Sequence, residues 1–181
     1  HRVDRRQRQM CIRDRYMSSY EYFETTFENI YDLWNEGLWP SRVSKIESRS
    51  SLSWDARLWE GYGNIYITKN KERIWKYKPT FWAARSEGKL IGVNSGFKTN
   101  DDIYRSRGLY VSPEHRGHRV SNMLLKLTIN SAKQEECRII WTMPRKSALP
   151  AYESVGFRKI GGWIDEGVEF GPNCIAINEI L

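Results

Sequence analysis

The sequence predicts an α+β fold (α/β in the broad sense), in which a mixed, mostly antiparallel sheet carries helices on its faces. Three segments with strand character, at residues 80–85, 90–97 and 104–111, follow one another with only short turns between them, which is typical of an antiparallel meander. Residues 121–134 then place apolar side chains at helical spacing. A strand, a helix and two more strands follow, so that helices and strands are interspersed around one sheet.

The N-terminal half is expected to begin with a strand at residues 18–23, where aromatic residues alternate with small or acidic ones. A helix should start after Thr26, because the apolar residues that follow share one helix face, and should end by Gly37. Ser41 can cap a second helix. Residues 54–79 are compatible with either a helix or a strand followed by a helix.

In the C-terminal half, the sequence predicts a regular succession of turns, strands and helices. Residues 86–89 have the composition of a hairpin turn, and residues 100–102 that of a second turn. Beyond the helix at 121–134 we expect a buried strand at 137–143, a helix at 145–155 that stops at Gly156, and closing strands at 157–164 and 174–180.

The chain has 181 residues, a length that favours one domain, and we expect residues 17–181 to form it. Residues 1–16 are left out of this unit, because they resemble an in-frame translation of a sequencing-library adaptor, with Met17 as the natural start. A basic arm that binds nucleic acid is the alternative interpretation of this segment.

Charge and cysteine content narrow the classes of function. Residues 1–16 carry six arginines and two aspartates, a net charge of +4, so only +3 of the total formal charge of +7 belongs to the rest of the chain. A domain this weakly basic gives little support to nucleic-acid binding. Cys137 and Cys174 lie far apart in the sequence and form no CxxC or Cys/His cluster. We also find no signal segment before the domain and no apolar run long enough to span a membrane. We therefore expect a cytoplasmic protein with reduced, buried cysteines.

The segment from Leu109 to Leu125 carries the chemistry. A strand runs through a turn into the N-terminus of an amphipathic helix, where free backbone N–H groups and the positive end of the helix dipole favour phosphate. Gly117 allows a ligand to approach the backbone, and Arg116 matches phosphate oxygens in charge. His115 and His118 lack a third ligand nearby in the sequence, so we expect no metal site here.

This turn resembles the pyrophosphate loop of the GNAT acyltransferase superfamily, R/Q-x-x-G-x-G/A after a strand that ends in Val-x-Pro. Arg116 fits the first position. Arg119 lies where the motif usually has glycine, and Ser121 lies where it usually has glycine or alanine. The Tyr-Glu-x-x-Gly-Phe ending of residues 144–157 resembles a later helix of the same family. The resemblance is strongest over residues 80–163. The residues of these motifs are also similar to those of small GNAT proteins of tailed phages.

The resemblance implies an acyl-coenzyme A-dependent N-acetyltransferase that moves an acetyl group directly from acetyl-CoA to a primary amine of a small molecule or protein. It makes Tyr152 the proton donor to the departing thiolate, with a core aromatic as the alternative. Val111 would offer its N–H to the thioester carbonyl. The residues implied in cofactor binding are Leu109, Tyr110, Val111, Arg116, Gly117, His118, Arg119, Val120 and Ser121.

Two other classes remain open, a non-catalytic coenzyme A-binding GNAT-like module and a nucleic-acid-binding domain. The acceptor and the oligomeric state are not encoded in these motifs, and a homodimer is among the arrangements allowed. Arg105, Arg107, Arg145 and Lys146 are compatible with contacts to an acidic acceptor or to nucleotide phosphates, but a solvent-exposed face is the interpretation that composition favours.

Overall fold

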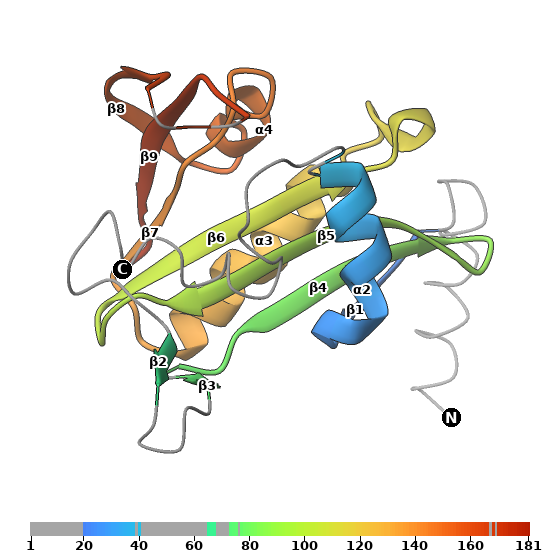
Figure 1. Cartoon of the computed structure of the whole chain (residues 1–181), viewed down its shortest axis with the longest axis horizontal. Helices are drawn as coiled ribbons and strands as arrows, with labels where there is room; N and C mark the ends of the chain where they lie inside the picture. The colour runs from blue at the N-terminus through green and yellow to red at the C-terminus, as the bar shows by residue number, and fades with distance from the viewer. Residues whose placement is uncertain are drawn as a thin grey trace, which may run out of the picture.

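The computed structural model (Figure 1) describes residues 20–38, 40, 65–67, 73–75, 77–166, 168 and 170–181. The adaptor-like segment 1–16 and the helix expected from Ser41 lie outside the described residues. No helix of the described residues is long and apolar enough to cross a membrane.

A seven-stranded sheet forms the centre of the molecule, and the mixed, mostly antiparallel sheet expected from the sequence is confirmed. Neighbouring strands are antiparallel except for one parallel pair, β6 and β7. In spatial order the strands are β1 (Tyr20–Thr25), β4 (Thr80–Ser86), β5 (Lys89–Lys98), β6 (Ile103–Val111), β7 (Ile139–Thr142), β9 (Asn173–Glu179) and β8 (Arg158–Ile164).

A separate two-stranded sheet pairs β2 (Ile65–Ile67) with β3 (Arg73–Trp75). The helix considered for this stretch is therefore wrong at these residues. The two short segments are rich in isoleucine and aromatic residues, which favour a pleated strand over a helix.

Helices cover both faces of the large sheet (Figure 1). On one face, α2 (Phe27–Asp32) continues into the π-helical turn η1 (Leu33–Leu38), which contacts β5 and β6. On the other face, α3 (Val120–Gln134) packs against β4, β5 and β6. The short helix α4 (Leu149–Glu153) packs between α3 and β8.

Helix α4 is shorter than the helix expected at residues 145–155. Pro150 lies in its first turn, where a residue without an N–H donor is tolerated. The preceding residues form a turn instead, in which the N–H groups of Ala148 and Leu149 both donate to the carbonyl of Arg145.

Hydrophobic side chains join the helices to both faces of the sheet. Under α2, Ile30 is fully buried together with Phe97 of β5. Under α3, Leu124 packs on Ile91 of β5, and Leu125 packs near Tyr104 of β6. Each such side chain contributes about 1.5–3 kcal/mol of transfer free energy when fully buried, so α3 is held rigidly along the sheet.

The parallel strands β6 and β7 separate part-way along their length. Their pairing runs only from Ile103 to Arg105, whereas β6 continues to Val111. One extra residue also enters β6 opposite β5, near Gly108, whose φ is +79°, and such a bulge bends the strand. Figure 1 shows β7, β9, β8 and α4 splayed away from the far end of β6, so the sheet opens at this point.

Candidate active site

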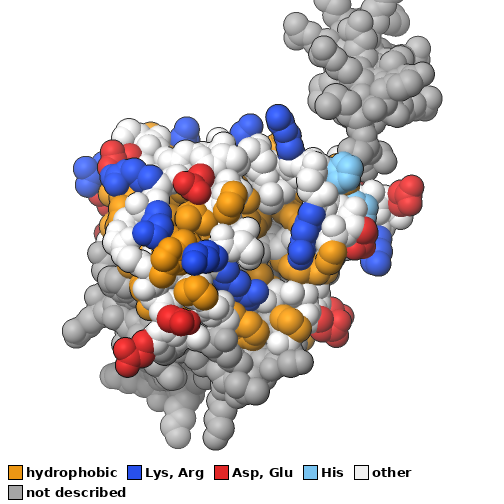
Figure 2. Space-filling view, turned by 90° about the horizontal axis from the view of Figure 1, so that it is seen from above, with side chains coloured by type: hydrophobic (Ala, Val, Ile, Leu, Met, Phe, Trp, Pro, Cys, Tyr) orange, Lys and Arg blue, Asp and Glu red, His pale blue; other side chains and the backbone are white. Residues whose placement is uncertain are grey.

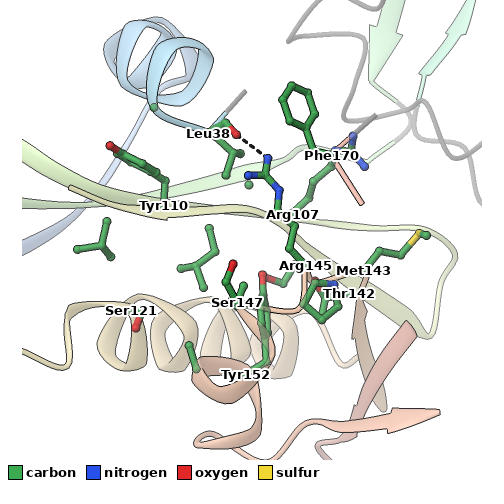
Figure 3. Close-up of a pocket in the computed structure, with 18 of the residues that line it drawn as sticks. Leu38, Arg107, Tyr110, Ser121, Thr142, Met143, Arg145, Ser147, Tyr152 and Phe170 are labelled. Carbon is green, nitrogen blue, oxygen red and sulfur yellow. Dashed lines mark hydrogen bonds between the residues drawn. The ribbon is translucent and has the colours of Figure 1, made fainter. Parts of the chain in front are cut away.

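A pocket of about 450 Å³ occupies the opening between β6 and the segments that follow β7. Its walls are the last half of β6, the turn after it, the start of α3, the β7–α4 connection, α4, and residues of η1 and the β8–β9 segment. Figure 3 shows these elements converging on one space. The residues expected from the sequence that line it are Leu109, Tyr110, Val111, Arg116, Gly117, Arg119, Val120, Ser121 and Tyr152, whereas His118 does not.

The turn after β6 is fixed at both of its ends. The Ser112 N–H donates to the Ile91 carbonyl at 2.7 Å, which extends the strand pairing by one residue. A 3₁₀ turn, η4 (Pro113–His115), follows, and the Arg116 side chain folds back so that Nε donates to the Val111 carbonyl at 2.9 Å. The chain therefore enters α3 along a defined path.

Helix α3 presents its free N-terminal donors to this pocket. The Met123 N–H makes the first turn's bond, to the Arg119 carbonyl at 3.1 Å. The N–H groups of the three residues before Met123 consequently have no acceptor within the helix. Val120 and Ser121, two of these three, line the pocket, and the helix dipole adds a partial positive charge there. This end of the pocket is suited to a phosphate group.

Arg119 occupies the left-handed region of backbone conformation, with φ +61° and ψ +20°. This conformation is unfavourable by about 1–2 kcal/mol for a residue with a Cβ atom, whereas glycine adopts it without this cost. The position at which the family motif usually has glycine is thus one at which the backbone requires a left-handed residue. Arg119 keeps that backbone and adds an exposed cation at the pocket wall.

The first strand braces the same turn. The Tyr20 hydroxyl lies 3.0 Å from Nδ1 of His115, and the two rings meet edge to face at 5.6 Å. The His118 ring lies 6.3 Å from that of Tyr20, and the two described histidines lie close together on the face seen in Figure 2. Among the described residues, no group of three or more His, Cys, Asp or Glu side chains is placed to hold a metal ion.

Tyr152 enters the pocket from α4 and is 3% exposed. Burial raises the pKa of its hydroxyl above the usual value, and hydrogen bonding to Thr142 and Ser106 only partly opposes this shift. The phenol therefore keeps its proton at neutral pH. A buried, protonated hydroxyl in a cleft can act as a general acid.

Comparison with known proteins decides the family. Residues 49–157, more than half of the chain, match the model of the acetyltransferase (GNAT) family. The chain belongs to this family. N-acetyltransferase family 8 member 3 of Rattus norvegicus is 28% identical over 89 residues, and human N-acetyltransferase 8B is 29% identical over 89 residues. Each match covers 45% of this chain and 39% of the relative, so the chain matches well under half the length of either relative.

Solved structures agree on the fold. ElaA of Escherichia coli has a TM-score of 0.62 at 12% identity, over 88% of this chain and 99% of that one. A GNAT acetyltransferase of Elizabethkingia anophelis, solved with acetyl-CoA bound, has a TM-score of 0.58 at 14% identity, over 88% of this chain and 97% of that one. At such identities the likeness is one of fold.

In this GNAT protein a buried polar network supports the pocket from the α3 side. Asn94 of β5 is fully buried, and its Nδ2 donates to Ser106 at 3.1 Å and to Thr128 of α3 at 2.8 Å. Ser106 in turn lies beside the Tyr152 hydroxyl. Sequence reasoning missed this network, although Asn94, a polar residue in the middle of the mostly apolar strand β5, was its signal.

Three arginines that the sequence offered as contacts to an acidic acceptor or to phosphates line the pocket. Arg105 is 3% exposed and its guanidinium sits 4.4 Å from the centre of the Trp141 ring, so the solvent-exposed interpretation is wrong for it. Burial lowers the pKa of Arg107 to about 10, which leaves it charged at neutral pH. Arg145 is partly buried and also lines the pocket, whereas Lys146 is exposed and lies outside it.

Proposed function

We propose that this GNAT protein is an acetyl-CoA-dependent N-acetyltransferase that transfers the acetyl group directly to a primary amine of a small molecule or protein. One observation carries the proposal: the opening between β6 and β7 joins an anion-binding helix N-terminus to the buried, protonated hydroxyl of Tyr152. A thioester donor with a phosphate-bearing handle needs both features in one cleft.

The residues present fit coenzyme A. The first-turn N–H groups of α3, with Arg116 and Arg119 beside them, would hold the diphosphate. Beyond Arg105, no strand of the described residues pairs with β6 on the β7 side, so its backbone groups are proposed to bind the amides of an extended ligand. When bound, acetyl-CoA supplies the acetyl group as an activated thioester.

The chain's own groups then account for the transfer. The N–H of Val111 would polarise the thioester carbonyl at the end of β6. Tyr152 would deliver its proton to the departing sulfur, which its raised pKa allows because the phenol stays protonated. Among the described residues that line the pocket there is no Asp or Glu, so water is proposed to carry away the proton of the amine.

Two measurements test the proposal in sequence. Isothermal titration with acetyl-CoA should show binding, and a panel of amines should then release free thiol. Absence of binding to acetyl-CoA, together with salt-sensitive binding to RNA or DNA, would contradict it in favour of a nucleic-acid-binding domain. Binding without thiol release from any amine would instead identify a non-catalytic coenzyme A-binding module.

The domain assignment of 17–181, the cytoplasmic location and the assembly into a homodimer remain predictions that accompany this function. Removal of residues 1–16 should leave the melting temperature and thiol release unchanged. Sedimentation of the full-length chain and of the shortened chain measures the oligomeric state directly.

A further inference from the structure

We infer that the acceptor is an amine whose molecule also carries a carboxylate, an amino acid with an apolar side chain, and that Arg145 binds this carboxylate. The inference rests on the proposed function and names the substrate class of the same site. The two ends of the pocket lie on opposite faces of the sheet (Figure 1).

The phosphate-binding end belongs to α3, which covers one face of the sheet, whereas Gly37 and Leu38 of η1 line the pocket on the other face. Figure 3 shows Ser121 at the α3 end and Phe170 at the opposite end, with Tyr152 between them. A donor whose phosphates lie at α3 would therefore leave the space beside η1 to the acceptor.

Arg145 lies at that acceptor end and is held in place. Its Nη2 donates to the Leu38 carbonyl, and its guanidinium stacks over the Phe170 ring at 4.9 Å. Its backbone pairs with that of Asn173 in an isolated bridge. A guanidinium has five N–H donors, and among the described residues the Leu38 carbonyl is the one acceptor found for it. Donors remain for a ligand, in a plane that is already fixed.

The charge of the pocket favours an anionic acceptor. Its described lining contains arginines and no Asp or Glu, and in the view from above basic side chains lie among hydrophobic ones in the middle of the face (Figure 2). A simple ammonium compound would meet repulsion there. A carboxylate on the same molecule would offset this and can accept two parallel bonds from a guanidinium. Leu38, Val168 and Phe170 add an apolar wall for a side chain.

The test compares matched substrates and matched variants. The specificity constant kcat/KM for thiol release is measured with phenylalanine, leucine and methionine and with their carboxamides, which lack the carboxylate charge. For the wild type we expect at least one free acid to exceed its amide by about tenfold or more, the size of one charge-assisted hydrogen bond. In Arg145→Gln the acid-to-amide ratio should fall by about tenfold.

Lys146→Gln is the matched control, because it removes the same charge from the next residue, which lies outside the pocket. Its acid-to-amide ratio should equal that of the wild type. Comparing ratios between variants cancels the different basicities of acid and amide. Titration with acetyl-CoA checks that both variants still fold and bind the donor.

Four outcomes would overturn the inference. An unchanged ratio in Arg145→Gln would make Arg145 a structural tie between η1 and the β7–α4 connection. A loss of acetyl-CoA affinity in Arg145→Gln, with no change in the ratio, would assign it to the donor. Turnover of amides but not of acids would reject the substrate class while leaving the proposed function intact. Failure of every amine, despite acetyl-CoA binding, would reject the proposed function together with the inference.

Discussion

Nε of Arg116 donates a hydrogen bond to the backbone carbonyl of Val111, 2.9 Å away. This bond closes the turn between β6 and α3, because it joins the last residue of the strand to the residue that follows η4. The arginine at the first position of the family motif thus has a structural task in addition to its charge. It shapes the turn that presents the α3 N-terminus to the pocket.

Replacing Arg116 with lysine separates these two tasks. Lysine keeps the positive charge but has no planar Nε–H at this position, so the turn should lose its brace. We expect Arg116→Lys to weaken acetyl-CoA binding by about tenfold and Arg116→Ala by more, as for loss of a hydrogen bond to a charged group. Isothermal titration measures both. Lys126→Ala, on the exposed side of α3, removes one charge elsewhere and should bind normally; wild-type affinity in Arg116→Lys would show that charge alone matters.

Substitutions at Arg119 and Gly117 should change the free energy of unfolding in opposite directions. Both residues have a positive φ, +61° and +81°. Arg119→Gly should raise the free energy of unfolding by about 1 kcal/mol, because a Cβ atom is strained in this conformation. Gly117→Ala should lower it by about 1 kcal/mol through the backbone alone, since an added Cβ would meet no atom of the described residues within 4 Å. Urea denaturation measures both changes.

The Arg119→Gly variant also tests what the Arg119 side chain contributes to the binding of acetyl-CoA. If its guanidinium contacts the diphosphate, Arg119→Gly should bind acetyl-CoA more weakly although the protein is more stable. Equal or tighter binding would mean that the arginine is only a strained substitute for the usual glycine.

The strands of the C-terminal half could be predicted because their determinants are local. The meander from Thr80 to Val111 has turn residues at each reversal, and α3 has a clear apolar face. The start of α4 was misjudged, because a helical pattern continues N-terminal to Pro150 although the chain there forms only a turn. Local patterns also could not assign residues 65–67 and 73–75, whose pairing joins two segments that are not contiguous in the sequence.

The site was predicted only where a contiguous motif encodes it. The family resemblance, which rests on two contiguous motifs, implied the turn at 116–121 and Tyr152, and nine of the ten expected residues line one pocket. The separation of β6 and β7 could not be predicted, since it depends on how far two strands stay paired. Leu38 and Arg145 meet although they are 107 positions apart, and no sequence pattern links them.

Cys137 and Cys174 should be unreactive in the native state. Both are fully buried, and burial raises the pKa of Cys137 to about 11, so little thiolate forms near pH 8. In a Cys11→Ser chain, Ellman's reagent should label neither thiol until denaturant is added, and both afterwards. Rapid labelling of one thiol without denaturant would contradict the packing around β7 and β9.

Tyr152→Phe tests the proton donor. Loss of the hydroxyl should lower kcat for thiol release by about 100-fold, the usual scale of general-acid catalysis, and should leave the affinity for acetyl-CoA nearly unchanged. Tyr31→Phe, at a 43% exposed site on α2, is the matched control and should retain full activity. A fall in kcat of less than about threefold would remove Tyr152 from this role, since general acids contribute far more.

The pH dependence gives an independent check on Tyr152. A donor must be protonated, and burial raises its pKa above the ordinary tyrosine value of 10. The wild-type rate should therefore show no loss from this group until the pH exceeds 10, and any loss above it should be absent from the residual activity of Tyr152→Phe. Circular dichroism at each pH separates this effect from unfolding. An alkaline limb below pH 10 that disappears in Tyr152→Phe would mean that the hydroxyl ionises more easily than its buried position allows.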